Sequence, residues 1–339
     1  MKNTKLLSVA GLALAASIVC SPAHAIFRAY LALDGNDANP CTLQLPCRLL
    51  PAAMTAVDVG GEIWMLDSAN YNTAPVSVTK SVSILAVPGV VGSVVATGGG
   101  GNNGLNIATP GVKVSLRNLV FIMLTAGNYG VAFTDGAELT VQDCEFANFT
   151  LMGGGIYASA LNGKVTLRDT TIRNSQFGFQ VSNSGRAVLQ GVRVLNNGIG
   201  IYVVNSQVAV SDSVISGNTQ VGIEVYSGTG APSSATISNS LVANNATGAK
   251  AESFAAGDTS SIVIAGSSFS HNTTAAISLF QGASSQTNAT LDGNVFAHNT
   301  SVVSTAGTVS APTVYSRINN TLRNNAGGDT LATTALTAY

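Results

Sequence analysis

Short segments in which apolar and polar residues alternate recur along most of the chain. Residues 139–142, 165–168 and 208–211 each place an apolar residue at every second position. Successive side chains of a β-strand point to opposite faces, so this period of two predicts strands with one buried face. A large apolar residue, such as Phe146 or Ile172, follows each segment. The pattern therefore predicts many short strands around one long core.

The strands belong to a longer repeat, in which each unit resembles the next. A unit contains an alternating strand, a corner, a second short strand, an Asn-rich corner and a third strand such as 200–203 or 222–225. The Asn-rich corner begins, in successive units, at Asn148, Asn174, Asn196, Gly217, Asn244, His271, His298 and Asn324. One such unit cannot bury its apolar face alone, so the repeat predicts a solenoid. The predicted fold class is all-β: a right-handed, single-stranded parallel β-helix with three short strands per coil and an N-terminal helical cap.

Both corners have a physical explanation. The first corner is always Asp, Gly or Asn, at Asp143, Asp169, Gly191, Asp212, Asn239, Gly266, Gly293 and Asn319. These residue types tolerate the positive φ of a sharp bend, so we interpret the recurring aspartates as corner residues rather than as a catalytic row. The second corner continues with Asn197, Asn218, Asn245, Asn272, Asn299 and Asn325. The amides of such a stack can hydrogen-bond to one another along the axis.

The N-terminal part of the chain is less regular. Residues 48–57 predict a short helix that covers the open end of the solenoid, where strand edges would otherwise be unpaired. Cys41 and Cys47 lie close together, and we expect them to form a disulfide in an exported protein. We divide the chain into a signal peptide (1–25), an N-terminal cap with the disulfide loop and the short helix (26–75), the parallel β-helix (76–325) and a C-terminal tail (326–339).

The N-terminal segment 1–25 indicates export. Lys2 and Lys5 precede an apolar stretch that ends at Cys20, and Ala23 and Ala25 fit a signal-peptidase cleavage site. A lipidated Cys20 is the less favoured alternative. We therefore expect a secreted or periplasmic protein that uses a Sec-type signal peptide. With 9% charged residues and a net charge of −1, we expect neither nucleic-acid binding nor membrane insertion, and we expect a monomer.

The motifs resemble those of secreted bacterial β-helix proteins of the pectate-lyase-like superfamily. The run from Asp143 to Asn148 and the strands that begin Gly-Ile-x-Val are similar to coils of that superfamily. The cap segments 34–48 and 60–67 resemble a bacterial subgroup that is known only by its fold. The resemblance implies the β-helix fold. It does not imply one activity, because such proteins include lyases, hydrolases, epimerases and adhesins. It also implies that the third strand of each coil lines a substrate cleft.

The outward residues of the third strand form the candidate binding site. In successive coils they are Tyr157, Gln180, Tyr202, Glu224 and Lys250. Tyrosine rings can stack on sugar rings, and the other side chains can hydrogen-bond to hydroxyl groups. The alternative is an ordinary exposed column with an ion pair between Glu224 and Lys250. The partner that we expect is a polysaccharide or a cell-surface glycan.

The case for catalysis is incomplete in the sequence. Glu224 and Lys250 are the catalytic candidates, but a glycoside hydrolase needs two carboxylates and only Glu224 lies in this column. Loops near residues 70–75 or Asp258 could contribute others. We therefore favour a non-catalytic scaffold, with a carbohydrate-active lyase or hydrolase as the alternative. No cofactor is predicted; Ca²⁺ at residues 34–39 is considered, but a polar turn is favoured there.

Two further features have structural explanations. Cys144 occupies a position that other coils fill with small residues, so we expect a buried, packed thiol rather than a nucleophile. His271 and His298 are one coil apart, hence about 5 Å apart, and could share a metal. Asn and Gly fill their column in other coils, so we interpret both histidines as corner residues and predict no metal site.

Overall fold

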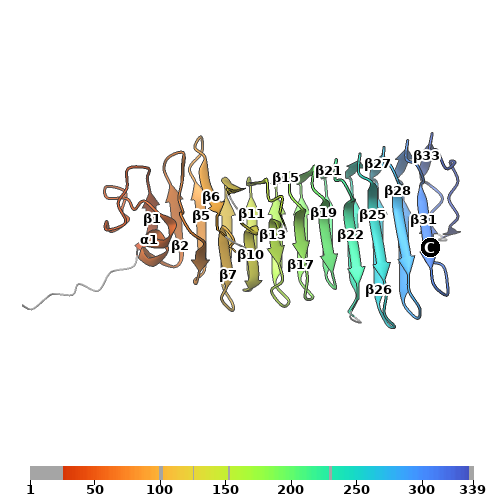
Figure 1. Ribbon diagram of the computed structural model, residues 1–339, viewed down its shortest axis with the longest axis horizontal. Coiled ribbons are helices and arrows are strands. Elements are labelled where there is room, and N and C mark those ends of the chain that lie inside the picture. Colours follow the sequence, from red (N-terminus) through yellow and green to blue (C-terminus); the bar gives the residue numbers. More distant parts are fainter. Residues whose placement is uncertain (1–25, 99–101, 125, 152, 229–230, 336–339) are drawn as a thin grey trace, which may run out of the picture.

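A computed structural model describes residues 26–98, 102–124, 126–151, 153–228 and 231–335. The predicted signal peptide, including Cys20, lies outside these residues. Figure 1 shows coils stacked along one long axis, with the only labelled helix at one end and the C-terminus at the other. The coils form three parallel sheets, which we name A, B and C.

Within the described ranges, sheet A has 13 strands, sheet B has 11 and sheet C has 10. Sheet A contains, in spatial order, β1 (Ile26–Leu31), β2 (Val57–Met65), β5 (Val82–Ala86), β8 (Lys113–Arg117), β11 (Glu138–Gln142), β14 (Lys164–Arg168), β17 (Arg186–Gln190), β20 (Gln207–Ser211), β23 (Ser233–Ser238), β26 (Thr259–Ala265), β29 (Gln286–Asp292), β32 (Thr313–Ser316) and β34 (Thr334–Ala335). Sheet B contains β3 (Ala69–Asn70), β6 (Gly92–Ala96), β9 (Leu119–Met123), β12 (Glu145–Ala147), β15 (Thr171–Arg173), β18 (Arg193–Leu195), β21 (Val214–Ser216), β24 (Leu241–Ala243), β27 (Ser268–Ser270), β30 (Val295–Ala297) and β33 (Thr321–Arg323). Sheet C contains β4 (Val76–Val78), β7 (Leu105–Ala108), β10 (Tyr129–Asp135), β13 (Gly154–Ala158), β16 (Phe177–Val181), β19 (Ile199–Val204), β22 (Val221–Ser227), β25 (Thr247–Ser253), β28 (Ala275–Gln281) and β31 (Val303–Gly307).

One coil consists of one strand from each sheet, as the repeat predicts. In the coil formed by β14, β15 and β16, each strand pairs in parallel with the same strand of the next coil. This register stacks equivalent residues, so the large apolar position of the repeat becomes a continuous buried column. Phe121 and Phe146 stack in that column with ring centroids 4.5 Å apart, and both are fully buried. The predicted three-stranded parallel β-helix is confirmed.

Most of the predicted first corners have a positive φ. The angle lies between 47° and 65° at Asp143, Asp169, Gly191, Asp212, Asn239, Gly266 and Gly293. The prediction was wrong at Asn319, because Ile318 has the positive φ in the last coil instead. That corner has one extra residue: Leu291 and Asn294 are three positions apart, whereas their equivalents Ser316 and Asn320 are four apart. The extra residue moves the bend onto Ile318.

The second corner contains the predicted asparagine ladder. From Asn197 to Asn299, each buried side chain donates from Nδ2 to Oδ1 of the Asn in the next coil, at distances of 2.8 to 3.2 Å. The same Oδ1 accepts the backbone N–H of the preceding corner. The last member, Asn325, donates to Asp329 from both its backbone and its amide. These hydrogen bonds lower the pKa of Asp329.

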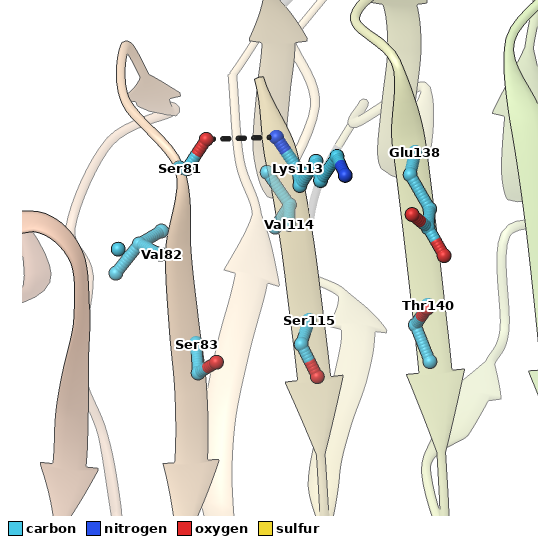
Figure 2. Close-up of a pocket in the computed structure, with 9 residues that line it drawn as sticks. Ser81, Val82, Ser83, Lys113, Val114, Ser115, Glu138 and Thr140 are labelled. Carbon is cyan, nitrogen blue, oxygen red and sulfur yellow. Dashed lines mark hydrogen bonds between the residues drawn. The ribbon is translucent and has the colours of Figure 1, made fainter. Parts of the chain in front are cut away.

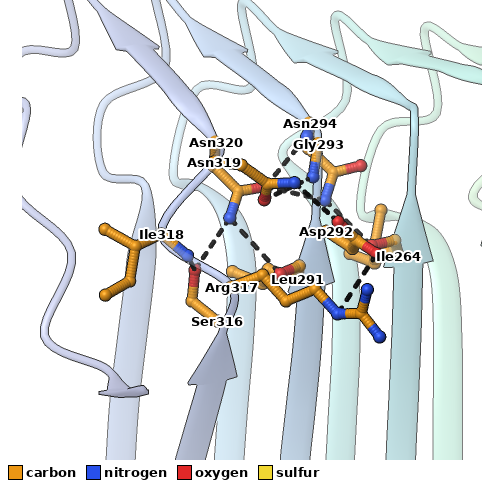
Figure 3. A network of polar contacts seen from close by, with 10 residues as sticks. All are labelled: Ile264, Leu291, Asp292, Gly293, Asn294, Ser316, Arg317, Ile318, Asn319 and Asn320. Carbon is orange, nitrogen blue, oxygen red and sulfur yellow. Dashed lines mark hydrogen bonds and ion pairs between the residues drawn. The ribbon is translucent and has the colours of Figure 1, made fainter. Parts of the chain in front are cut away.

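A second ladder follows the first corner and explains Cys144. The thiol accepts the N–H of Leu119 at 3.5 Å and donates to the Gln142 carbonyl at 3.2 Å. Hydroxyl groups make the same two contacts in later coils, for example Ser240, which accepts from Ser213 and donates to the Ser238 carbonyl. The ladder ends in Asn294 and Asn320, which Figure 3 shows beside Asp292 and Arg317. Cys144 is therefore a buried ladder member, as its position in the repeat indicates.

The N-terminal end is covered as predicted. Helix α1 (Leu50–Ala56) buries Leu50, Ala53 and Met54 against the first strands. Cys41 and Cys47 form the predicted disulfide, and the backbone at both cysteines hydrogen-bonds to Tyr30 on the outer edge of β1. Strands β1 and β2 already belong to sheet A, so the sheets run continuously across residue 75. The boundaries of the four predicted segments stay a prediction.

We predict that Ile318→Asn stabilises the protein. Ile318 is 77% exposed with φ 62°, a conformation that disfavours a β-branched side chain and that Asn tolerates. Figure 3 shows its side chain pointing away from the polar network, so little packing is lost. We expect a gain of about 1 kcal/mol, measured as a rise of a few degrees in Tm.

The matched control is Val309→Asn, at an equally exposed residue, 80% accessible, that has no positive φ. An equal rise in Tm for both variants would contradict the backbone explanation.

Candidate functional site

The structure places the predicted binding residues in one column of sheet C. Tyr157 pairs with Gln180, Gln180 with Tyr202, Tyr202 with Glu224, and Glu224 with Lys250. Their neighbours in the same strands are buried in the core, so all five lie on the outer face. The five residues therefore form a column on the protein surface, and the role of this column in binding stays a proposal.

Each tyrosine of the column stacks on a ring that the sequence reasoning missed. Tyr129 lies 5.0 Å from Tyr157, and Phe177 lies 5.8 Å from Tyr202, between ring centroids. Tyr129 and Phe177 begin the sheet C strand of the preceding coil. In the sequence, each of these rings lies three positions before the residue that its own strand contributes to the column, at the corner where the chain enters that strand. One ring face of each tyrosine is thus covered, and its position is held by stacking.

Glu224 and Lys250 meet, and Glu252 joins them. The Lys250 ammonium lies 3.5 Å from Glu224 Oε1 and 2.7 Å from Glu252 Oε1. Glu252 lies two residues after Lys250, so it occupies the same outer face, and this alternation could have identified it. We call these three residues the acid–lysine cluster. Glu224 remains the only carboxylate within the column, and Glu252 adds a second one from the neighbouring column of the same face.

Burial and charge determine the electrostatics of the cluster. Glu224 is 8% exposed, and burial raises its pKa, with the Glu252 charge adding to the effect and Lys250 opposing it. Burial disfavours the charged form of Lys250, but its contacts with Glu252 and Glu224 hold its pKa above the usual value. Burial, with the nearby carboxylates, raises the pKa of Tyr202 to about 12. The tyrosine therefore remains a neutral hydroxyl group at physiological pH.

A further group of rings lies on the other side of the cluster. Phe254 is 5.5 Å from Tyr226 and 4.9 Å from Phe280, between ring centroids. Tyr226 pairs with Glu252, and Glu252 pairs with Phe280, so the rings adjoin the acid–lysine cluster directly. Phe254 is 45% exposed, which is unusual for a phenylalanine. Aromatic rings thus flank the charged cluster on both sides. We use the name aromatic face of sheet C for the acid–lysine cluster together with the rings around it, which are Tyr129, Tyr157, Phe177, Tyr202, Tyr226, Phe254 and Phe280.

Other candidate residues have structural roles. His271 and His298 stack with centroids 5.0 Å apart and both have positive φ, which confirms them as corner residues. Burial raises the pKa of Cys144 to about 12, so the thiol is protonated at neutral pH. In the loop 34–39, Asp37 accepts the backbone N–H groups of Arg48 and Leu49. Over the residues that the structure describes, no group of three His, Cys, Asp or Glu side chains could hold a metal ion.

Sheet A also has hollows on its outer face. One of them, of about 300 Å³, lies across β5, β8 and β11. Figure 2 shows Lys113 and Glu138 there, beside serine and threonine side chains. The Lys113 N–H donates to Ser81 Oγ at 3.0 Å. This hollow has no aromatic ring in its lining, in contrast to the aromatic face of sheet C.

The comparisons with known proteins agree with this geometry. Residues 103–256 match the family model described as right handed beta helix region. The protein has a right-handed β-helix fold. No helix in the described part of this β-helix chain is long and apolar enough to cross a membrane.

Several solved β-helix structures are similar to the chain at low sequence identity, which shows the common fold alone. XylC in complex with xylose, at 8% identity, has a TM-score of 0.55 over 82% of this chain and 70% of its own. The lacto-N-biosidase of family GH136 from Eubacterium ramulus, at 10% identity, has a TM-score of 0.52 over 88% and 68%. The enzymatically active domain of tailspike protein 2 from bacteriophage CBA120, at 12% identity, scores 0.54 over 78% of this chain but only 44% of that chain. No curated protein matches the sequence.

We predict that Glu224→Gln does not destabilise the protein at pH 7. The folded-state pKa of Glu224 is raised above the ordinary value of 4.5, so this group favours folding only at low pH. As pH rises through the folded-state pKa of Glu224, its buried charge opposes folding. In the variant this charge is absent, and Lys250 still forms its ion pair with Glu252. Thermal melts should show an equal Tm or one higher by about 2 °C at pH 7, and no gain at pH 3.

Glu145→Gln is the matched control, because Glu145 forms an ion pair with Arg173 at a more exposed position. A lower Tm for Glu224→Gln at pH 7 would show that the pair with Lys250 outweighs the cost of burial.

Proposed function

We propose that the protein is an exported, non-catalytic scaffold that binds an uncharged polysaccharide or cell-surface glycan along the aromatic face of sheet C. The observation that carries the proposal is the arrangement of aromatic rings on both sides of a cluster of hydrogen-bonding side chains. Sugars combine apolar C–H faces with hydroxyl groups, and such a surface offers a contact for each.

The regular register suits a polymer rather than a single small molecule. Tyr157, Gln180 and Tyr202 lie in three successive coils, separated by the spacing of neighbouring strands, about 4.8 Å. A ligand with repeating units can therefore contact several coils with similar groups. Weak contacts at each coil then add to a useful affinity. Two structural neighbours support a carbohydrate ligand by their names, since one is a lacto-N-biosidase and one is in complex with xylose.

Charge favours an uncharged glycan over an acidic one. The acid–lysine cluster has two carboxylates for one ammonium group, and that ammonium already binds both. An acidic polymer would bring further negative charge close to Glu224 and Glu252, with no free cation in the cluster to receive it. Hydroxyl groups of a neutral sugar can donate to the carboxylates without this penalty.

The disulfide supports export. Cys41 and Cys47 are bonded, and such bonds persist in oxidising compartments outside the cytoplasm. This agrees with the signal peptide predicted for residues 1–25, so the glycan would be met at or beyond the cell surface. Ca²⁺ has no assigned role in this proposal and is varied in the experiments.

We predict that Tyr157→Ala combined with Tyr202→Ala weakens glycan binding at least tenfold. Each ring contributes on the order of 1 kcal/mol beyond its buried area, and tenfold corresponds to about 1.4 kcal/mol. Binding would be measured by depletion from solution with insoluble xylan, cellulose and chitin, with polygalacturonate as the acidic counterpart.

Tyr315→Ala, on strand β32 of sheet A, is the matched control and should bind as the unaltered protein does. Equal binding by the double variant, or preferred binding of polygalacturonate, would contradict the proposal.

A second candidate function is glycoside hydrolysis, and the observation that favours it is Glu252. The Lys250 ammonium lies 3.5 Å from one oxygen of Glu224 and 2.7 Å from one oxygen of Glu252. The distance between these two oxygens therefore cannot exceed the sum of the two contact distances. Retaining glycosidases separate their carboxyl groups by about 5–5.5 Å. The raised pKa of Glu224 would suit a proton donor to the glycosidic oxygen, while Glu252 would attack the anomeric carbon. Water would then release the sugar from Glu252 and return the proton to Glu224.

For this candidate we predict that the chain length of neutral and acidic polysaccharides stays unchanged after incubation with the mature protein, with or without Ca²⁺. The Lys250 ammonium forms an ion pair with both carboxylates and so occupies their reactive oxygens, which is why we rank hydrolysis second. Shortened chains, with cleavage lost in both Glu224→Gln and Glu252→Gln, would overturn the scaffold proposal and locate the active site. Cleavage that survives both substitutions would contradict the assignment of this pair.

A further inference from the structure

A hollow of about 560 Å³ lies on the outer face of sheet A, near its N-terminal end. Its apolar lining includes Trp64 on β2, Leu85 on β5 and Pro88 in the turn that follows. Its polar lining includes Glu62, Arg117 and Asp143. The volume falls within the range of small-molecule sites, about 300–1,000 Å³. It is larger than the hollow of Figure 2 and, unlike that one, contains an aromatic ring.

Trp64 is held firmly at this position. The Arg28 guanidinium lies 4.1 Å from the ring centroid, over one face of the indole. Trp64 Nε1 donates to Glu62 Oε2 at 2.9 Å, and Arg28 Nε donates to the same oxygen at 2.8 Å. The ring of Tyr30 meets the indole edge-on at 6.3 Å. A surface side chain held by three neighbours loses little freedom when a ligand binds, so the indole is a preorganised platform.

The polar groups define what the hollow can hold. Arg117 Nε lies 3.6 Å from Asp143 Oδ2, and the two side chains are 63% and 42% exposed. The hollow thus offers a guanidinium donor and two carboxylate acceptors around an apolar floor. An anionic ligand would face both Glu62 and Asp143, whereas a cation would lie beside Arg117. A neutral ring with one C–H face and hydroxyl groups at its edge satisfies the floor, the donor and the acceptors together.

We propose that this hollow is a second carbohydrate site, which takes one pyranose ring of an uncharged sugar. The sugar lies against Trp64 and Leu85, its hydroxyl groups accept from Arg117, and they donate to Asp143. The site is on sheet A, so it is distinct from the aromatic face of sheet C. It does not depend on the proposed function of that face.

The chain contains a single tryptophan, so Trp64 is a reporter for this hollow alone. The mature protein is titrated with xylose, glucose and N-acetylglucosamine, each as the monomer and the tetramer, and with galacturonate. We expect saturable changes in tryptophan fluorescence and reduced quenching by acrylamide with at least one neutral sugar, and no saturation with galacturonate. Arg117→Ala, whose side chain is 63% exposed, should weaken that binding about tenfold.

Arg168→Ala is the matched control, because Arg168 is an exposed arginine in the same column of sheet A, two coils further on. It should leave the titration within twofold of the unaltered protein. The combined Tyr157→Ala and Tyr202→Ala variant should also keep the fluorescence response, which separates this site from the sheet C face. Unchanged Trp64 fluorescence with every sugar, equal binding of galacturonate, or a titration insensitive to Arg117→Ala would overturn the proposal.

Discussion

The whole structure depends on satisfying the backbone at its corners. A chain that turns sharply three times per coil leaves N–H and C=O groups at each bend without a strand partner, and a buried unpaired group costs about 1–3 kcal/mol. At two of the three corners, the asparagine ladder and the hydroxyl ladder accept backbone N–H groups from inside. Because each asparagine from Asn197 to Asn299 bonds to the asparagine of the next coil, this corner also holds neighbouring coils in register.

That register determines where surface chemistry can lie. Residues at equivalent positions of successive coils become neighbours, whatever their distance along the chain. Tyr202, Glu224 and Lys250 meet for this reason, although a full coil of the chain separates each from the next. Alternation along a strand adds the second dimension, and it brings Glu252 to the same ammonium as Glu224. On the outer faces of the solenoid, each side chain is therefore next to the equivalent residues of the adjacent coils and to the residues two positions away in its own strand. We call this regular arrangement a grid.

The grid explains how far the sequence could predict the structure. The coils, the asparagine ladder, most of the first corners and the column on sheet C follow from the period and from alternation, which act locally, whereas the disulfide follows from the closeness of Cys41 and Cys47 in an exported chain. Ile318 could not be predicted as a bend, because an inserted residue shifts the corner without changing the strands around it. The hollow at Trp64 depends on the shape of the turn after β5 and on Arg28 from the first strand. Neither belongs to the repeat, so periodicity contains no information about them.

Asp329 has a consequence for the length of the molecule. Every asparagine of the ladder both donates to the following coil and accepts from the preceding one, so the ladder has a direction and no natural last member. A carboxylate accepts from Asn325 but has no hydrogen to pass on. The ladder is therefore directional, and a single acidic side chain marks its end, although sheet A continues for one more short strand, β34.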